Sequence, residues 1–247
     1  MTNICTFTDG AALHQAAARF IIDAAQEAVR ARGRFKIALS GGNTPLALFR
    51  QLVLPPLREE MPWQDTHFFW SDERCVPPSH AESNYFQARE ALFKRAPVMP
   101  ENIHRVQGEL PPDTACRDYL MQLHRYADGE MPFPTFDLVL LGLGDDGHTA
   151  SLFPGARAEE EWTQPAVAVT AHYGDRPANR VSLTPLAFNA ARAVVFLVTG
   201  PSKAKAVAAT LQDQADWVRW PAQMVSPTNG TLKWFVDDAA GSALRHE

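Results

Sequence analysis

The chain has 247 residues, of which 46% are hydrophobic and 21% are charged, an ordinary composition for a globular protein. It carries 23 basic and 28 acidic residues, and the resulting formal charge of −5 argues against nucleic acid or a membrane surface as a partner. The length suffices for one large α/β domain or two small ones, and a small anionic ligand must be held by a local basic cluster.

An amphipathic helix is predicted over residues 11–31, because apolar side chains recur there at steps of three and four. Thr8 or Asp9 is suited to cap its start, and Gly33 is suited to end it. Beyond it, short apolar runs predict strands, and helical segments fall between them. The strands are expected at residues 35–39, 67–70, 136–141, 167–170, 194–199 and 232–236, and the further helices at 45–57, 82–94, 113–126 and 202–211.

This alternation predicts an α/β fold of three layers, in which a mostly parallel, Rossmann-like sheet carries helices on both faces. The run 136–141 is almost wholly apolar, as expected for a strand covered on both sides. The Pro-rich stretches are too short to be domain linkers, and no internal repeat is visible. We therefore expect a single domain over residues 1–247.

The first segment with chemical potential follows the first predicted strand and leads into a helix. Its two glycines let backbone N–H groups approach a ligand closely, and the helix N-terminus favours an anion there. Thr44 is suited to cap that helix and Pro45 to occupy its first position. The segment is therefore either a phosphate-binding loop or a plain tight turn. Its residues are Ser40, Gly41, Gly42, Asn43 and Thr44.

Three charged residues, Asp72, Glu73 and Arg74, end the second predicted strand. Charged residues in a row at a strand end are rarely part of a core. They belong either to a functional site or to a solvated loop. The segment continues through residues 82–85 into a predicted helix.

A glycine-rich segment follows the apolar strand at 136–141. Gly142, Gly144 and Gly147 formally match G-x-G-x-x-G, but two aspartates inside the loop would repel a pyrophosphate, and no acidic residue ends the next strand. The better interpretation is a histidine, His148, presented between small residues with the carboxylate of Asp146 to orient it. A lone histidine usually has a structural role, but a histidine flanked by glycine beside an aspartate at a strand end has one less often.

Two cations, Arg180 and Lys203, lie beside later predicted strands. Lys203 is expected in the first turn of a helix, where the helix dipole disfavours a cation, so an anionic ligand is a suitable partner. Residues 200–204 approach the G-x-S-x-G nucleophile elbow without its final glycine, and we interpret Ser202 as a helix cap.

Other features argue for absences. Cys5, Cys75 and Cys116 are far apart, so no disulfide framework is implied, and reduced thiols fit a cytoplasmic protein. No signal peptide and no membrane-spanning run is visible. No pair of histidines has the spacing of a helical zinc site, so neither a metal nor another cofactor is expected.

Taken together, these segments resemble the 6-phosphogluconolactonases of the sugar-phosphate isomerase/deaminase-like superfamily. Each motif is moderately specific, but the motifs occur in the expected order and span nearly the whole chain. The matching segments are residues 40–45, 72–77, 83–85, 142–154, 180–184, 200–204 and 221–234.

The resemblance implies a metal-free hydrolase of a sugar-phosphate lactone in the oxidative pentose phosphate pathway, as a monomer or small homo-oligomer. It implies that His148 is the general base that activates water and that Asp146 is its supporting carboxylate. A lactone is an activated ester, so no covalent nucleophile is required. The substrate and phosphate binders implied are Ser40, Gly41, Gly42, Asn43, Thr44, Asp72, Arg74, Arg180 and Lys203.

Two alternatives remain. An amino-sugar-phosphate deaminase/isomerase of the same superfamily shares the glycine loop and the Asp-Gly-His segment, but we expect a tyrosine there at the position of Arg74. A non-catalytic sugar-phosphate sensor would keep the phosphate binders and lose the base, whereas His148 and Asp146 are both present.

Overall fold

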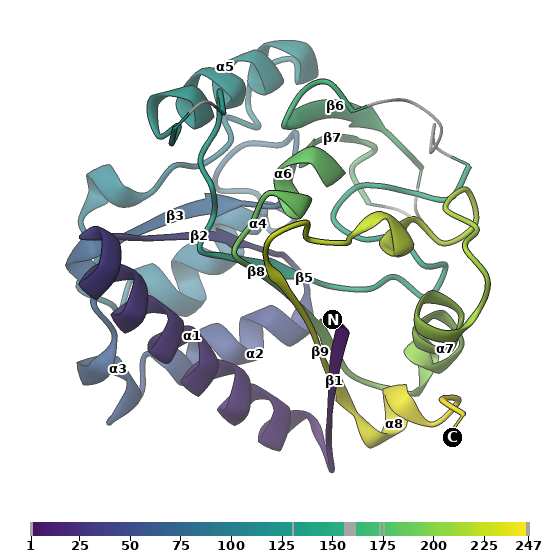
Figure 1. Cartoon of the computed structure of the whole chain (residues 1–247). Helices are drawn as coiled ribbons and strands as arrows, with labels where there is room; N and C mark the ends of the chain where they lie inside the picture. Colours follow the sequence, from purple (N-terminus) through teal and green to yellow (C-terminus); the bar gives the residue numbers. More distant parts are fainter. Residues whose placement is uncertain (1, 130, 156–161, 173, 175, 246–247) are drawn as a thin grey trace.

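The computed structural model describes residues 2–129, 131–155, 162–172, 174 and 176–245. Its main feature is a sheet of six strands in the order β1–β9–β8–β5–β2–β3, in which every neighbouring pair is parallel (Figure 1). In that order the strands span Thr2–Phe7, Thr231–Asp237, Ala193–Val198, Leu138–Leu141, Phe35–Leu39 and Thr66–Trp70.

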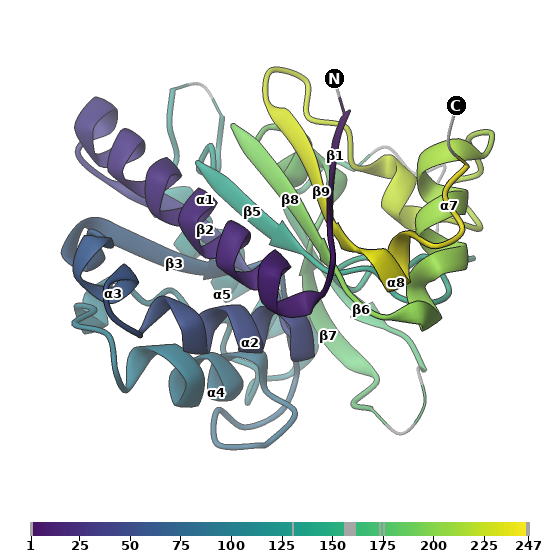
Figure 2. The ribbon, with the colours of Figure 1, turned by 90° about the horizontal axis from the view of Figure 1, so that it is seen from below.

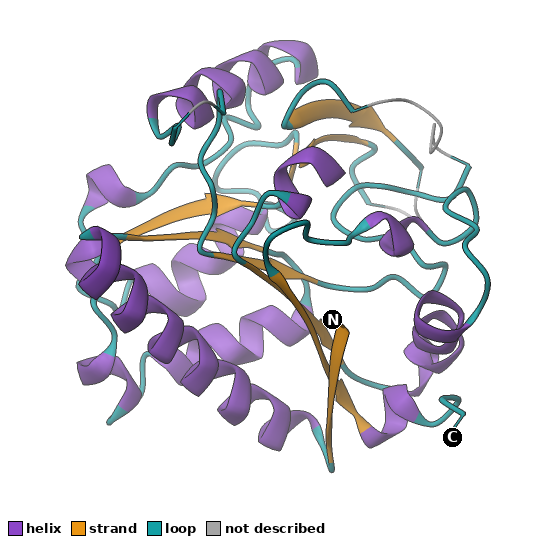
Figure 3. Cartoon of the chain, viewed as in Figure 1, coloured by secondary structure: helices purple, strands orange, loops and turns teal. Residues whose placement is uncertain are grey.

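A second, three-stranded antiparallel sheet joins β4 (Asp72–Arg74), β7 (Asn179–Leu183) and β6 (Ala166–Thr170). Figure 3 shows β6 and β7 beside α5 (Pro112–Arg125), apart from the main sheet. The strand predicted at 167–170 therefore exists but belongs to this separate sheet. The sequence did not predict β1, β4 or β7, because none of them carries a long apolar run.

Helices cover both faces of the main sheet, and the three-layer prediction is confirmed (Figure 2). The reason lies in the alternation of side chains along each strand. Ile37 and Leu39 pack with α1 (Gly10–Arg32) and α2 (Asn43–Leu52), whereas Ala38 faces the opposite cluster. That opposite cluster includes residues of α5, the second sheet, α6 and α7.

The remaining helices are short. They are α3 (Leu57–Glu60), α4 (Asn84–Ala88), α6 (Pro185–Asn189), α7 (Ala204–Gln212) and α8 (Asp238–Gly241), with 3₁₀ turns at Trp63–Asp65, Pro100–Asn102, Pro201–Lys203 and Pro221–Met224 and a π-helical turn at Arg89–Phe93. The single helix predicted over 82–94 is thus α4 followed by the π-helical turn.

The caps of the first helix are as predicted. The side chain of Asp9 accepts a hydrogen bond from the N–H of Ala12 at 2.8 Å, and Gly33 ends α1 in the left-handed conformation with φ 74°. Asp9, rather than Thr8, is the capping residue.

Two other predicted caps are wrong. Gly42, with φ 101°, precedes α2, which therefore begins two residues before Pro45, and the hydroxyl of Thr44 instead lies 2.8 Å from that of Thr199. Ser202 caps nothing, because Pro201 already begins a 3₁₀ turn that continues into α7. The helix predicted over 45–57 also ends early, at Leu52, ahead of consecutive prolines that cannot continue it.

Candidate active site

A cavity of about 380 Å³ opens at the carboxyl ends of β2, β5 and β8, the edge at which open parallel sheets bind ligands. Every predicted site residue except Asp146 lines it. These lining residues are Ser40, Gly41, Gly42, Asn43, Thr44, Asp72, Arg74, His148, Arg180 and Lys203. Asp146 does not line the cavity, but its carboxylate contacts Nδ1 of His148, which does.

The histidine and the aspartate form a close pair after β5. Nδ1 of His148 lies 2.6 Å from Oδ1 of Asp146, and the backbone N–H of His148 donates to the same oxygen at 3.1 Å. Partial burial raises the pKa of Asp146, but its hydrogen bonds and the charge of His148 outweigh burial and hold the pKa below its usual range. An ionised Asp146 can accept a proton from Nδ1 of His148, an arrangement that leaves Nε2 to exchange a proton with a ligand.

Glycines make this pair possible. A Cβ on Gly144 would lie 2.1 Å from Nδ1 of His148 and 2.4 Å from Oδ1 of Asp146, so no other residue fits without displacing the pair. Gly147 has φ 87°, and a Cβ there would lie 2.3 Å from Cε3 of Trp220. These glycines thus serve to seat a histidine–aspartate pair, which supports the interpretation preferred over a nucleotide loop.

The cationic side of the cavity is built from two facing arginines. Arg74 on β4 and Arg180 on β7 are register partners, and they are only 6% and 2% exposed. Arg74 donates from Nη1 to the carbonyl of Glu82 at 2.7 Å. Nε of Arg74 and both Nε and Nη2 of Arg180 are buried without a hydrogen-bond partner among the described residues.

This arrangement has a cost, which the carboxylate of Glu82, 3.5 Å from Nη1 of Arg74, offsets in part. Like charges directly opposite on neighbouring strands repel, and buried N–H groups without an acceptor lose their hydration. Burial lowers the pKa of Arg180, and the nearby charge of Asp72 opposes that shift. Both arginines line the cavity, so their positive charge there favours an anionic ligand.

A second cationic region lies where β2 and β8 end. Lys203, in the 3₁₀ turn before α7, and the loop that leads into α2 both line the cavity. The contact between Thr44 and Thr199 joins the two loops. The backbone N–H groups at the start of α2 and the ammonium of Lys203 can bind one anion between them.

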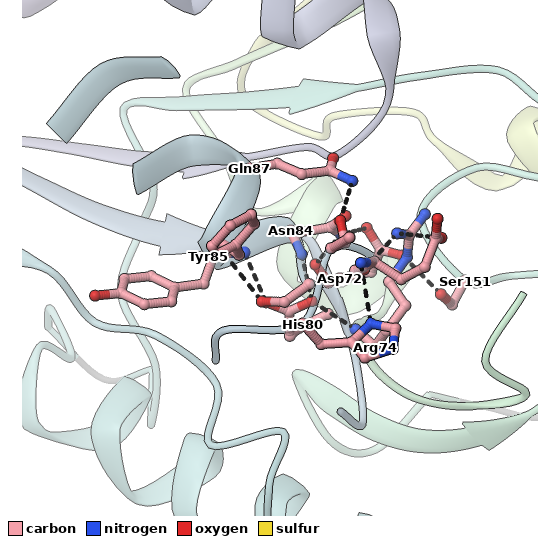
Figure 4. A network of polar contacts seen from close by, with 12 residues as sticks. Asp72, Arg74, His80, Asn84, Tyr85, Gln87 and Ser151 are labelled. Atoms are coloured by element: carbon pink, nitrogen blue, oxygen red, sulfur yellow. Dashed lines mark hydrogen bonds and ion pairs between the residues drawn. The ribbon is translucent and has the colours of Figure 1, made fainter. Parts of the chain in front are cut away.

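The three charged residues at 72–74 do not form a solvated loop, because all three are buried in β4. Asp72 accepts a hydrogen bond from the hydroxyl of Ser151 at 2.7 Å and one from Nδ2 of Asn84 at 3.2 Å (Figure 4). Asp72 thereby links β4 to the loop that carries His148.

Two residues of the site were not predicted from the sequence. Arg176 lines the cavity and belongs to no motif of the sequence, so only its spacing of four from Arg180 could have drawn attention to it. Asn84 lies in the segment 83–85 that resembles the family, but no role was assigned to it from the sequence. In the structure its side chain donates hydrogen bonds to Asp72. Over the described ranges, no group of three or more metal-ligating side chains gathers, and no helix there combines the length and hydropathy of a membrane span.

The model of the family described as glucosamine-6-phosphate isomerases/6-phosphogluconolactonase matches residues 8–234. The chain belongs to this family. The 6-phosphogluconolactonase of Haemophilus influenzae is 37% identical over 204 residues, which cover 83% of this chain and 85% of that one. The crystal structure of the Thermotoga maritima 6-phosphogluconolactonase is 32% identical, with a TM-score of 0.81 over 96% of this chain and 100% of that one.

The fold is also shared with an enzyme of another activity. A monomeric glucosamine-6-phosphate deaminase superposes with a TM-score of 0.82 over 98% of this chain and 99% of that one. Its sequence identity is 20%, so this likeness shows a common fold alone.

Proposed function

We propose that the chain hydrolyses 6-phospho-D-glucono-1,5-lactone to 6-phosphogluconate, the second step of the oxidative pentose phosphate pathway. The observation that carries this proposal is His148, held by an ionised Asp146 on the wall of a cavity that also presents Arg74, Arg180 and Lys203. The lactonases among its relatives support the same reaction.

In the proposed mechanism, His148 removes a proton from a water molecule while the water oxygen bonds to the lactone carbonyl carbon. The tetrahedral oxyanion then collapses, the bond from that carbon to the ring oxygen breaks, and the imidazolium returns its proton to the ring oxygen. Asp146 stabilises the imidazolium formed between these steps. The product hydroxy acid then loses a proton and leaves as a carboxylate.

Substrate binding is proposed to divide over the two cationic regions of the cavity. Residues 40–44 with Lys203 form one, and Arg74 with Arg180 forms the other. The phosphate and the developing oxyanion are the two negative groups that these regions can stabilise. Asp72 also lines the cavity, and both of its carboxylate oxygens already accept hydrogen bonds from the protein.

The remaining properties are proposed with the same reaction. It runs without a cofactor, a metal or a covalent intermediate, because a His-activated water suffices for an already reactive ester. We propose a cytoplasmic protein with one domain over residues 1–247, a monomer or small homo-oligomer.

Deamination of an amino-sugar phosphate is the nearest rival activity. Arg74, at the position where we expect a tyrosine in that group, lines the cavity together with Arg180, and two cations there favour an anionic ligand. A sensor without catalysis would not require the histidine–aspartate pair.

A direct assay tests the proposal. Freshly prepared 6-phosphogluconolactone is followed by proton release with and without protein, so that spontaneous hydrolysis is subtracted, and glucosamine-6-phosphate is offered in parallel. We expect rapid lactone hydrolysis and no ammonia release. Deamination without lactonase activity would establish the rival.

A further inference from the structure

Glu73, between two cavity residues on β4, points to the opposite side of the strand. Glu73 is only 2% exposed. Its carboxylate accepts hydrogen bonds from the backbone N–H groups of Arg74, Asn84 and Tyr85, each at 2.7 Å. The hydroxyl of Ser83 adds a fourth at 3.0 Å. One buried carboxylate thus fixes the start of α4 against β4.

Asn84, which Glu73 holds by its backbone, turns its side chain back toward the site. Nδ2 donates to the carbonyl of Asp72 at 2.8 Å and to its carboxylate at 3.2 Å (Figure 4). On the other side, the amide meets the backbone of Gly41: a Cβ on Gly41 would lie 2.0 Å from Oδ1 and 2.4 Å from Cγ of Asn84. Asn84 is 2% exposed and therefore packed between these two segments.

We infer that Asn84 is a positioning residue of this site, which sets the separation between the Gly41–Gly42 loop and Asp72 while Glu73 anchors it. The inference rests on the proposed function, because it concerns the segments proposed to bind the substrate. Gly41 and Asp72 both line the cavity, and Asn84 stands directly behind them.

An amide is the group that this place requires. It donates a hydrogen bond to a carboxylate while remaining uncharged beside a loop that binds anions. A carboxylate in its place would repel Asp72 and weaken the loop's attraction for phosphate. An apolar side chain would leave the buried carbonyl of Asp72 without that donor.

The test compares Asn84→Asp, close to isosteric, with the wild type and with Gln87→Ala as a matched control. Gln87 lies on the same helix and donates from Nε2 to the carbonyl of Ala81 rather than to Asp72 or Gly41. We expect Asn84→Asp to raise KM for the phospholactone, and Kd for 6-phosphogluconate by calorimetry, about ten- to one-hundred-fold. The control should change neither constant appreciably.

The pH dependence of the ratio of variant to wild-type Kd separates positioning from a loss of structure. A protonated carboxyl can donate the hydrogen bond to Asp72 that the amide donates, so the ratio should narrow as pH falls from about 8 to about 6. The titratable groups that face residue 84 are Asp72 and Glu73, and burial raises the pKa of Glu73 to about 7, within this range. Both groups are present in the wild type as well, so the ratio removes their shared contribution. A ratio that stays constant with pH, or a Kd equal to that of the wild type, overturns the inference. Asn84→Ser provides a smaller side chain if Asn84→Asp does not fold, and it should raise Kd without that pH dependence.

The two proposals fail separately. Calorimetry with 6-phosphogluconate requires no turnover, so a wild type that binds this ligand without hydrolysing the lactone refutes the proposed function alone. A fully active wild type whose Asn84 variants keep the normal KM and Kd refutes the positioning role alone. A wild type that neither binds nor hydrolyses refutes both.

Discussion

Oδ1 of Asp146 lies 2.6 Å from Nδ1 of His148, and this contact leaves Nε2 to exchange a proton with a ligand. We expect His148→Ala to lower kcat by about 10²–10⁴, the usual contribution of a general base, while the melting temperature stays close to that of the wild type. Asp146→Asn should lower kcat less, because Asp146 orients the imidazole and does not itself take the proton from water. Steady-state kinetics with subtraction of spontaneous hydrolysis measures both, and near-normal turnover by His148→Ala would refute the mechanism.

Gly144 offers a steric test of the same pair. In Gly144→Ala the new methyl group must displace His148 or Asp146, so we expect a loss of kcat approaching that of His148→Ala. The matched control is Gly142→Ala, whose Cβ would meet nothing nearer than Oγ of Ser40 at 3.9 Å and should lose far less. Equal losses in the two variants would show that the approach to His148 is not the cause.

The facing arginines predict a trade between stability and activity. Arg180→Met removes a buried guanidinium whose burial Asp72 offsets only in part, so the melting temperature should hold or rise, whereas kcat/KM should fall by at least about tenfold. Arg117→Met, an exposed change on α5, is the control and should leave kcat/KM unchanged. A large drop in melting temperature for Arg180→Met would mean that the arginine is structurally satisfied rather than reserved for an anion.

The same cationic groups predict dependence on the substrate's phosphate. Charge-assisted hydrogen bonds contribute about 1.5–3 kcal/mol each, so losing several should lower kcat/KM by orders of magnitude. Unphosphorylated gluconolactone should therefore be a poor substrate in the same assay. Comparable kcat/KM values for the two lactones would rule out a dedicated phosphate site.

His104 predicts how stability varies with acidity. It packs between Phe69 and Tyr126, with ring centroids at 4.5 and 4.3 Å, and burial together with neighbouring His67 lowers its pKa to about 4. In the unfolded chain His104 is protonated below about pH 6.5, whereas in the folded protein it stays neutral down to about pH 4. The free energy of unfolding should therefore decrease as pH falls from about 6.5 to about 4, by roughly 3 kcal/mol at most. Urea unfolding should show a flatter pH profile for His104→Gln than for the wild type, and parallel profiles would contradict this.

Local sequence determined the features that depend on neighbours along the chain. Asp9 and Gly33 end α1 because capping involves only adjacent backbone groups. The apolar run of β5 predicted a strand covered on both faces, because consecutive apolar residues point to opposite sides of a strand and both sides must then be buried. The glycine loop after β2 and His148 after β5 were likewise recognisable, because strand ends in a parallel sheet meet at one edge.

Tertiary structure decided what depends on partners distant in the chain. β1 is a strand because β9, at the other end of the sequence, pairs with it. From the sequence alone, residues 72–74 fit a solvated loop as well as a buried strand. Pairing with β7 and the donors at the start of α4, which bind Glu73, decide for the strand. A charged side chain is buried favourably only where such partners surround it. These partners come from other segments of the chain, so the burial of Arg74 and the contacts of Asn84 could be found only in the folded structure.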